Sequence, residues 1–310
     1  MKRIQYHQYG GPETMRLEDF ELEDPGKGQV AVKVRFTAIN PIDWKLRNGV
    51  MKIVTGNTFP RAMGMDFSGT VTSVGAGVTR FKPGDAVFGM ARLKQGGAFG
   101  HAVVTNESFL SLKPGTVSFE NAACLATPGV TAWNGLIDKA RLKAGQHVFV
   151  NGCTGAVGEA AIQIARMLGA TVSGSCSAGA MQRARALGLR GVYDYRTTDF
   201  SKLGERFDVV YDTAATMPTA VGLSLLRENG VFLDLDPTPA KFLRSFVNRR
   251  LKVVVCSATA EILDRVARAA DEGNLRLPIA EIVPLGEAIR LLRDLEAGKK
   301  IGGKGLIAMD

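Results

Sequence analysis

The chain has 310 residues, of which 45% are hydrophobic and 22% are charged, and this composition is typical of a folded protein with a large core. No stretch reaches the ~18 apolar residues of a membrane span, and the residues after Met1 lack the apolar core of a signal peptide. We therefore expect a cytoplasmic protein without a membrane partner. The net charge of +9 comes from basic residues dispersed along the chain. Attraction of an anionic cofactor accounts for it, so we do not expect a nucleic-acid partner.

The first third of the chain predicts short antiparallel strands. Apolar and polar residues alternate over 30–37, which is the pattern of a strand with one buried face. Further strands are predicted at 67–74 and 86–89, and turns rich in glycine and proline at 75–77 and 81–85 separate them. Such strands and turns are typical of a barrel-like β domain.

A glycine-rich turn between a strand and a helix is the most informative motif. The apolar run 148–151 leads into the turn, an apolar-faced helix continues to Arg166, and a strand follows at 170–176. Backbone N–H groups at a helix start can approach a pyrophosphate closely where no Cβ intervenes, and the helix dipole favours an anion there. The alternative is a helix start whose glycines only allow tight packing. The candidate cofactor contacts are Gly152, Thr154, Gly155, Ala156, Val157 and Gly158.

The region after this turn indicates which dinucleotide binds. A protein that prefers NAD places an acidic residue at the end of the second strand, against the ribose hydroxyls. No acidic residue occurs from Ala160 to Tyr193, whereas Ser175 and Ser177 lie where a 2′-phosphate would arrive. Four arginines also lie in this stretch, although Arg183 and its neighbours also fit the solvated face of a helix. The sequence therefore predicts NADPH as the cofactor.

Strands and helices alternate through the rest of the chain, which predicts a mostly parallel sheet and an α/β fold. The basic segment at 236–250 is predicted to form either a loop or a helix. The predicted strands lie at 191–195, 207–212, 230–235 and 251–255, the predicted helices at 258–272 and 286–296, and a last strand at 304–308 that returns to the first domain.

Six motifs spread along nearly the whole chain, at 40–49, 64–71, 81–89, 131–133, 152–158 and 194–196. With these residues the chain resembles the medium-chain dehydrogenase/reductase superfamily, and within it the zinc-independent quinone oxidoreductase branch with its zeta-crystallin-like and reticulon-interacting-protein-like reductases. The resemblance implies a discontinuous GroES-like β-barrel domain at 1–122 and 259–310, and a Rossmann domain at 123–258. It also implies NADPH in the cleft between the domains and a homodimer joined through Rossmann sheet edges.

The resemblance implies chemistry without a metal. Zinc-dependent members carry a cysteine near the position of Asn40 and a Gly-His-Glu where this chain has Gly64-Met65-Asp66, and neither ligand is present. The implied activity is hydride transfer from NADPH to a quinone or an α,β-unsaturated carbonyl. The alternatives are a dedicated alkenal or enone double-bond reductase and, in another class, an NADPH-sensing or RNA-binding homologue without enzymatic activity.

Position within the family implies the remaining site residues. Asn40 is a candidate donor to the reacting oxygen, Asp43 is either an acid or a structural acceptor for backbone N–H groups, and Thr131 lies near the nicotinamide amide. Gly179 and Met181 stand where relatives often carry a basic residue, so Arg183, Tyr195 and Arg196 are the substitute contacts for the 2′-phosphate. Lys304 follows Gly303 as in the family, and it either approaches the cofactor or is solvated.

Overall fold

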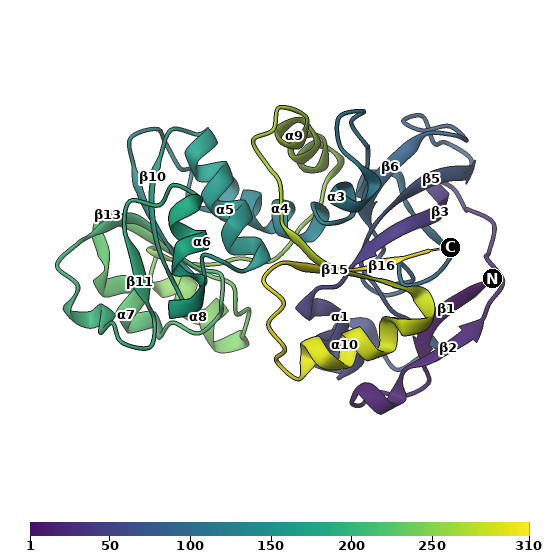
Figure 1. The fold of residues 1–310 in the computed structure, drawn as a ribbon, viewed down its shortest axis with the longest axis horizontal. Helices are drawn as coiled ribbons and strands as arrows, with labels where there is room; N and C mark the ends of the chain where they lie inside the picture. The colour runs from purple at the N-terminus through teal and green to yellow at the C-terminus, as the bar shows by residue number, and fades with distance from the viewer. Residues whose placement is uncertain (310) are drawn as a thin grey trace. The chain divides into compact units, whose positions relative to one another are not determined.

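The computed structural model describes residues 1–309, which form two compact units (Figure 1). One unit contains residues 1–127 and 258–309, and the other contains residues 128–257. The division falls inside the helix α4 (Ala126–Trp133). Within the described residues, no helix combines the length and the apolar character that a bilayer crossing requires.

The unit at 128–257 is built on a six-stranded parallel sheet with the order β11-β10-β9-β12-β13-β14. The first strand in the sequence therefore lies in the middle, and the chain winds outward from it in both directions, which is the strand order of a Rossmann sheet. The predicted α/β class with a doubly wound parallel sheet is confirmed. The strands are β9 (His147–Asn151), β10 (Thr171–Cys176), β11 (Val192–Asp194), β12 (Phe207–Asp212), β13 (Leu226–Asp234) and β14 (Leu251–Val253).

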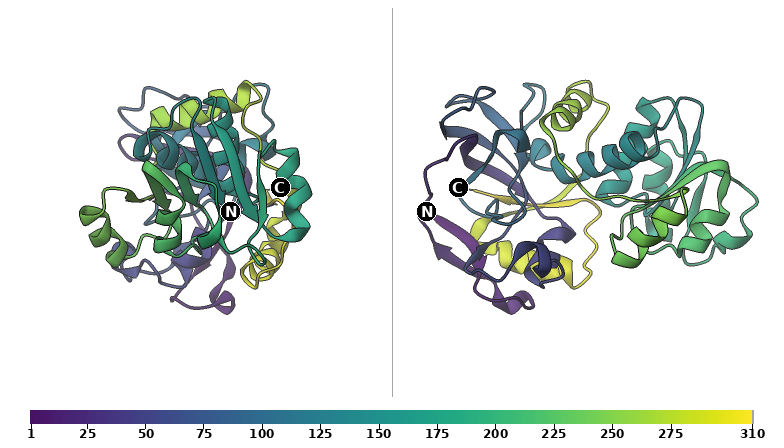
Figure 2. Two further views of the ribbon diagram at one scale, coloured as in Figure 1. Left: turned by 90° about the vertical axis from the view of Figure 1, so that its left-hand side faces the viewer. Right: turned by 180° about the vertical axis from the view of Figure 1, so that it is seen from behind.

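Helices cover both faces of this sheet, with α5 and α6 on one face and α7 on the other (Figure 2). The apolar core against the sheet includes Phe149, Phe207 and Phe232, all fully buried. The segment left open as loop or helix forms α8, whose first turn is capped by the Thr238 side chain. The helices are α5 (Ala156–Met167), α6 (Met181–Ala186), α7 (Thr219–Ser224) and α8 (Pro239–Val247), and α4 continues into a π-helical turn at Asn134–Lys139.

The other unit is mainly antiparallel and contains a seven-stranded and a three-stranded sheet. The predicted return of the chain end is confirmed, because β16 pairs antiparallel with β3 and places Leu306 opposite Ala38. The larger sheet contains β3 (Gln29–Ala38), β5 (Asp66–Val74), β6 (Ala86–Met90), β7 (Ala102–Asn106), β8 (Leu110–Leu112), β15 (Ile279–Pro284) and β16 (Lys304–Ala308). The smaller sheet contains β1 (Lys2–Tyr6), β2 (Arg16–Asp19) and β4 (Arg61–Ala62).

This unit contains two longer helices in its C-terminal part. The predicted helix at 258–272 begins two residues later because the Thr259 hydroxyl accepts a hydrogen bond from the Ile262 N–H, 3.2 Å away, and so caps it. The helices are α1 (Pro41–Arg47), α2 (Lys52–Thr55), α3 (Phe119–Ala123), α9 (Ala260–Asp271) and α10 (Ala288–Glu296). Short 3₁₀ turns lie at Pro12–Thr14, Glu107–Phe109, Ala178–Ala180, Phe200–Lys202 and Leu285–Glu287.

Candidate functional site

The glycine-rich turn lies at the carboxyl end of β9, where the winding direction of the sheet changes. In open α/β sheets ligands bind outside this edge, at such a switch point. Gly152 has φ +78, a left-handed conformation that favours glycine. A Cβ on Gly158 would lie 2.3 Å from the Gly152 carbonyl oxygen, so helix and turn pack too closely for a side chain there. Two of the three glycines are therefore required by the fold itself.

The start of α5 leaves backbone donors open at this turn. Gly155 is the N-cap residue, and the first helical hydrogen bond runs from the Glu159 N–H to the Gly155 carbonyl, 2.8 Å. The N–H groups of Ala156, Val157 and Gly158 precede that bond and have no acceptor within the helix. Gly155 is exposed, and an added Cβ would meet only the Gly152 carbonyl oxygen at 3.3 Å. The structure thus assembles the predicted set into a turn that can receive an anion.

Arg183 lies against this turn. Its guanidinium donates to the Thr154 carbonyl and lies 2.9 Å from Glu159 Oε1. Burial raises the pKa of Glu159 to about 7, and the arginine opposes this rise by favouring the charged carboxylate. The interpretation of Arg183 as a residue on a solvated helix face is wrong, because the side chain links α6 to the turn and pairs with the buried Glu159.

The two serines predicted to face the 2′-phosphate, at the end of β10, lie in different environments. Ser175 is fully buried and donates its hydroxyl to Asn151 Oδ1 at 2.5 Å, so it offers nothing to solvent. Ser177 is partly exposed, and Tyr195, whose N–H donates to the Cys176 carbonyl, is exposed. The expectation that Ser175 faces a 2′-phosphate is therefore corrected, since Ser175 lies inside the sheet.

Two further residues lie at this edge. The Arg196 guanidinium stands over the Tyr195 ring, 5.7 Å from its centroid. Asp194, the last residue of β11, pairs in register with Cys176, so a carboxylate lies beside the end of β10. This carboxylate lies one residue beyond the stretch from Ala160 to Tyr193, which has no acidic residue. The pairing of β10 with β11 is the signal that finds Asp194, and its oxygen accepts from the Arg196 N–H at 3.0 Å.

A network of buried charges in the other unit surrounds Asn40. Lys304 Nζ donates to the Ile39 carbonyl at 2.7 Å and to Asn40 Oδ1 at 2.6 Å. The Asn40 amide in turn donates to Asp66 Oδ2 at 2.9 Å, and Thr127 donates to both Asp66 oxygens from its backbone and hydroxyl. All members except Thr127 are buried in full or nearly so. The interpretation of Lys304 as solvated is wrong, and the Asn40 amide is engaged on both its oxygen and its nitrogen.

Asp43 lies next to this network, in the first turn of α1. Its Oδ2 accepts from the Asn40 N–H at 2.7 Å, and the Met65 N–H also donates to the carboxyl group. Oδ1 is buried and has no hydrogen-bond partner within the described residues. Burial is the main cause that raises the pKa of Asp43 to about 8. Asp43 thus serves as an acceptor for backbone N–H groups and carries a proton at neutral pH.

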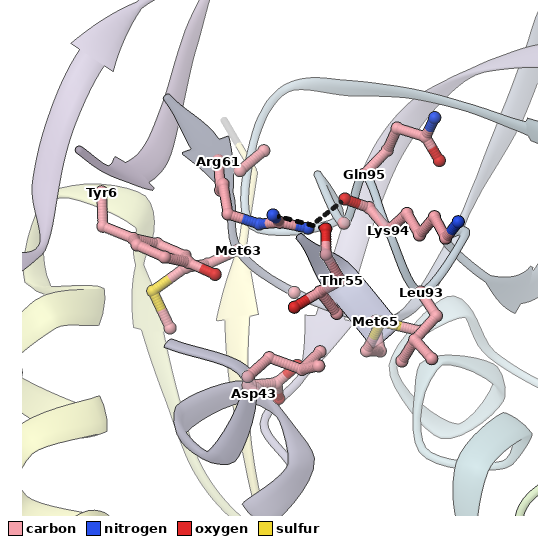
Figure 3. A pocket seen from close by; sticks show the side chains of 13 residues that line it. Tyr6, Asp43, Thr55, Arg61, Met63, Met65, Leu93, Lys94 and Gln95 are labelled. Carbon is pink, nitrogen blue, oxygen red and sulfur yellow. Dashed lines mark hydrogen bonds between the residues drawn. The ribbon is translucent and has the colours of Figure 1, made fainter. Parts of the chain in front are cut away.

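A small enclosed cavity adjoins Asp43 (Figure 3). Its lining includes Tyr6, Thr55, Arg61 and Met63, and the Arg61 guanidinium donates to the carbonyls of Thr55 and Lys94, both at 2.8 Å. The cavity offers about 10 Å³ to the centre of a water-sized sphere, which is room for a single water molecule. It is too small for an organic substrate.

Thr131 lies on α4 and is buried, and its carbonyl accepts from the Tyr211 hydroxyl at 2.8 Å. Beyond β12, Ala215 adopts a left-handed conformation with φ 56. This is a conformation that glycine adopts without strain. The roles proposed for Thr131 in catalysis and cofactor binding stay predictions.

The residues at the former metal positions do not fit a metal. Among residues 1–309, no three or more histidine, cysteine, aspartate and glutamate side chains gather into a possible ion site. Met65 is not a zinc ligand of the kind that these sites use, and Asp66 is already engaged by Asn40 and Thr127.

Comparison with known proteins identifies the class. Residues 26–119 match the alcohol dehydrogenase GroES-like domain, and residues 187–304 match a family described as zinc-binding dehydrogenase. The chain is 30% identical over 305 residues to the chloroplast envelope quinone oxidoreductase homolog of Arabidopsis thaliana, covering 93% of this chain and 92% of the relative. The family description mentions zinc, but the residues here do not supply its ligands.

Solved structures point the same way. The quinone oxidoreductase from Coxiella burnetii superposes with a TM-score of 0.90 at 30% identity, over 100% of this chain and 99% of that one. The Escherichia coli quinone oxidoreductase complexed with NADPH superposes with a TM-score of 0.84 at 26% identity, over 99% of this chain and 100% of that one. The chain therefore belongs to the medium-chain dehydrogenase/reductase superfamily, and within it to the quinone oxidoreductase branch. It is an oxidoreductase, and the predicted GroES-like domain is confirmed.

The raised pKa of Asp43 predicts a pH-dependent stability. Between its ordinary pKa near 3.8 and about 8 the folded protein holds a proton that the unfolded chain has lost, so the free energy of unfolding falls as the pH rises through this window. Asp43→Asn keeps an acceptor oxygen and removes the titration. We expect the melting temperature of the variant relative to the natural protein to rise by at least about 5 °C from pH 5 to pH 8.

The measurement is thermal unfolding followed by circular dichroism at several pH values. The exposed Asp24→Asn is the matched control and leaves the difference constant. A difference between Asp43→Asn and the natural protein that does not change with pH would show that Asp43 is ionised when folded.

Proposed function

We propose that this protein is a zinc-independent, NADPH-dependent oxidoreductase that transfers a hydride to a quinone. The observation that carries the proposal is the open start of α5 at the switch point of the parallel sheet, where the Ala156 and Val157 N–H groups meet no helical acceptor. The structure of the related Escherichia coli quinone oxidoreductase is a complex with NADPH, which supports the choice of cofactor.

The residues suited to hold the cofactor lie along one edge of the sheet. The open N–H groups of α5 suit the pyrophosphate, and Arg183 offsets the charge of Glu159 beside them. Ser177, Tyr195 and Arg196 gather at the end of β10 and suit a 2′-phosphate through hydroxyl donors and a cation. Asp194 lies on the same edge and opposes a phosphate, so Arg196 is needed to favour NADPH over NADH.

The acceptor must already be electrophilic, because Met65 and Asp66 do not form a site for a metal that could polarise it. Bound NADPH would supply a hydride from C4 of its nicotinamide, and a quinone becomes a hydroquinone when a proton is also added. The Asn40 amide and Asp43 are committed to buried partners. We therefore assign them a positioning role and assign the proton to solvent. An α,β-unsaturated carbonyl is the alternative acceptor, since its β-carbon accepts a hydride in the same way.

The experiment that tests this proposal measures cofactor binding and turnover together. NADPH and NADH are titrated by their fluorescence, and 1,4-benzoquinone or an enone is then added while cofactor oxidation is followed. We expect tighter binding of NADPH and faster oxidation with the quinone. Binding without oxidation by either acceptor would contradict the reductase assignment, and a higher specificity constant for the enone would favour a double-bond reductase.

Substitutions at two glycines of the turn distinguish an effect on stability from an effect on cofactor binding. Gly158→Ala places a Cβ 2.3 Å from a backbone oxygen, and we expect it to lower the free energy of unfolding by about 1–3 kcal/mol. Gly155→Ala places a Cβ 3.3 Å from the Gly152 carbonyl oxygen, a tight contact that a shift of a few tenths of an ångström relieves, and we expect a stability loss below about 1 kcal/mol. We expect a NADPH affinity at least about tenfold weaker, because the methyl group lies where the pyrophosphate approaches.

Denaturant unfolding and cofactor fluorescence measure both effects. Unchanged NADPH affinity in a folded Gly155→Ala protein would mean that the glycines serve packing alone.

Arg196 tests the choice between the two cofactors. Arg196→Ala removes the cation at the end of β10, and we expect the affinity for NADPH to fall about tenfold or more while the affinity for NADH stays within about twofold. The exposed Arg185→Ala on α6 is the matched control. Equal losses for both cofactors would show that Arg196 supports the fold of this edge and does not read the phosphate.

A further inference from the structure

One end of the seven-stranded sheet carries the buried network around Asn40 and one further cation. Asn40 follows β3, Asp66 begins β5 and Lys304 begins β16. Asp66 pairs with Met90, the last residue of β6, and Arg92 comes two residues later. The antiparallel strands therefore bring Arg92 to the same end of the sheet as the network.

The backbone at Arg92 is fixed on both sides. The Arg92 carbonyl accepts hydrogen bonds from the Gln95 N–H at 3.0 Å and from the Gly96 N–H at 2.8 Å, which closes a tight turn. Just before it, the Ala91 N–H donates to the Met65 carbonyl at 2.7 Å. The main chain of Arg92 is thus held close to the start of β5.

The side chain of Arg92, in contrast, has no partner among the described residues. Its Nε is buried and meets no acceptor. The two terminal nitrogens meet no acceptor either, but they are not enclosed, and the residue as a whole is partly exposed. Nearly all buried polar groups in folded proteins are hydrogen-bonded, and exceptions are expected at functional sites. The guanidinium therefore offers donors that a ligand can engage.

Neither Asp43 nor Asp66 is available to balance this cation. Asp66 accepts from the Asn40 amide and, with both oxygens, from Thr127. Asp43 accepts from the Asn40 N–H, and burial raises its pKa to about 8, so it is uncharged at neutral pH. The negative charge that would pair with Arg92 is therefore one that a ligand brings or a reaction creates.

We propose that Arg92 donates to the acceptor oxygen on which negative charge appears during reduction. This inference rests on the function proposed above. A quinone gains a hydride, and with it two electrons, from NADPH, which is oxidised to NADP⁺, and the oxygen of the resulting hydroquinone anion then takes a proton from solvent. Donors held in place at such an oxygen stabilise the transition state more than the neutral acceptor. A guanidinium keeps its own proton, so Arg92 supplies hydrogen bonds and charge only.

A negatively charged substituent on the acceptor is the other group that Arg92 could contact. Such a charge is present before the reaction, so contact with it lowers KM without raising kcat. Hydride transfer, in contrast, creates a negative oxygen in every quinone or enone, and the side chains of Asn40 and Asp43 are committed to other partners. We therefore assign Arg92 to the oxygen that is reduced.

The first test is steady-state kinetics with 1,4-benzoquinone, which carries no charge. Arg92→Met removes the cation and keeps the length of the stem. We expect kcat to fall at least about thirtyfold while KM changes less than about threefold, because the charge appears only in the transition state. Arg92→Lys keeps a cation and should recover part of the loss. Millimolar guanidinium should partly restore Arg92→Ala, which a structural defect would not allow.

Lys94→Met is the matched control, since it removes an exposed cation from the same turn. We expect it to keep the kinetics of the natural protein. Thermal unfolding shows that each variant is folded, and cofactor fluorescence should give a NADPH affinity within about twofold of the natural value for both positions.

A second measurement does not need turnover. The aromatic anion 4-nitrophenolate imitates the negative oxygen of the reduced acceptor, and its absorbance reports whether it is ionised. In the presence of NADP⁺ we expect the natural protein to bind it as the anion. Arg92→Met should weaken this binding at least about tenfold, whereas Lys94→Met should not.

Two results would overturn the assignment of Arg92. One is an Arg92→Met protein that keeps its kcat and its affinity for 4-nitrophenolate. The other is a loss confined to KM and to acceptors that carry a carboxylate, which would assign Arg92 to a charged substituent. Absence of turnover in the natural protein would instead contradict the proposed reductase, and binding of 4-nitrophenolate would then decide whether Arg92 meets an anionic oxygen.

Discussion

The buried contact between Lys304, Asn40 and Asp66 holds together parts of the chain that are far apart in sequence. Lys304 begins the last strand, Asn40 caps α1, and Asp66 begins β5, so one amide lies between a buried cation and a buried carboxylate. Lys304 follows Asn40 by 264 residues. Breaking such a buried pair typically costs about 3–5 kcal/mol because the remaining charge has no partner. The discontinuous unit therefore depends on its C-terminal strand for charge balance as well as for strand pairing.

Local sequence patterns predicted helices and strands, but they did not predict which charged side chains are buried or which segments they contact. Alternation and turn residues predicted the antiparallel strands, and apolar runs between helices predicted the parallel strands and the turn at 152–158. Strands such as β1 (Lys2–Tyr6) and β15 (Ile279–Pro284) were not predicted, since their residues mix charged and apolar types. The burial of Lys304 and the position of Asp194 beside the end of β10 were not predicted, because both depend on pairings between distant segments. Burial and register are long-range properties that a local pattern does not contain.

The glycine-rich turn shows that the same motif can be explained by backbone packing or by ligand binding. Gly152 and Gly158 are explained by backbone conformation and packing, so the same spacing would be expected even without a ligand. Gly155 is different, since an added Cβ would make one contact, 3.3 Å from the Gly152 carbonyl oxygen, and the residue is exposed at the helix start. Backbone conformation and packing do not require a glycine at position 155. Gly155 is therefore the glycine of the motif that indicates ligand binding.

The placement of carboxyl groups also changes the charge of the molecule. The formal +9 counts every aspartate and glutamate as ionised. Burial raises the pKa of Asp43 to about 8 and that of Glu159 to about 7, so at neutral pH the first carries a proton and the second is partly protonated. The folded protein is therefore more positive than its sequence suggests. A buried carboxyl group that holds its proton adds no negative charge to the outer field, so the surface attracts anions more strongly than the count implies.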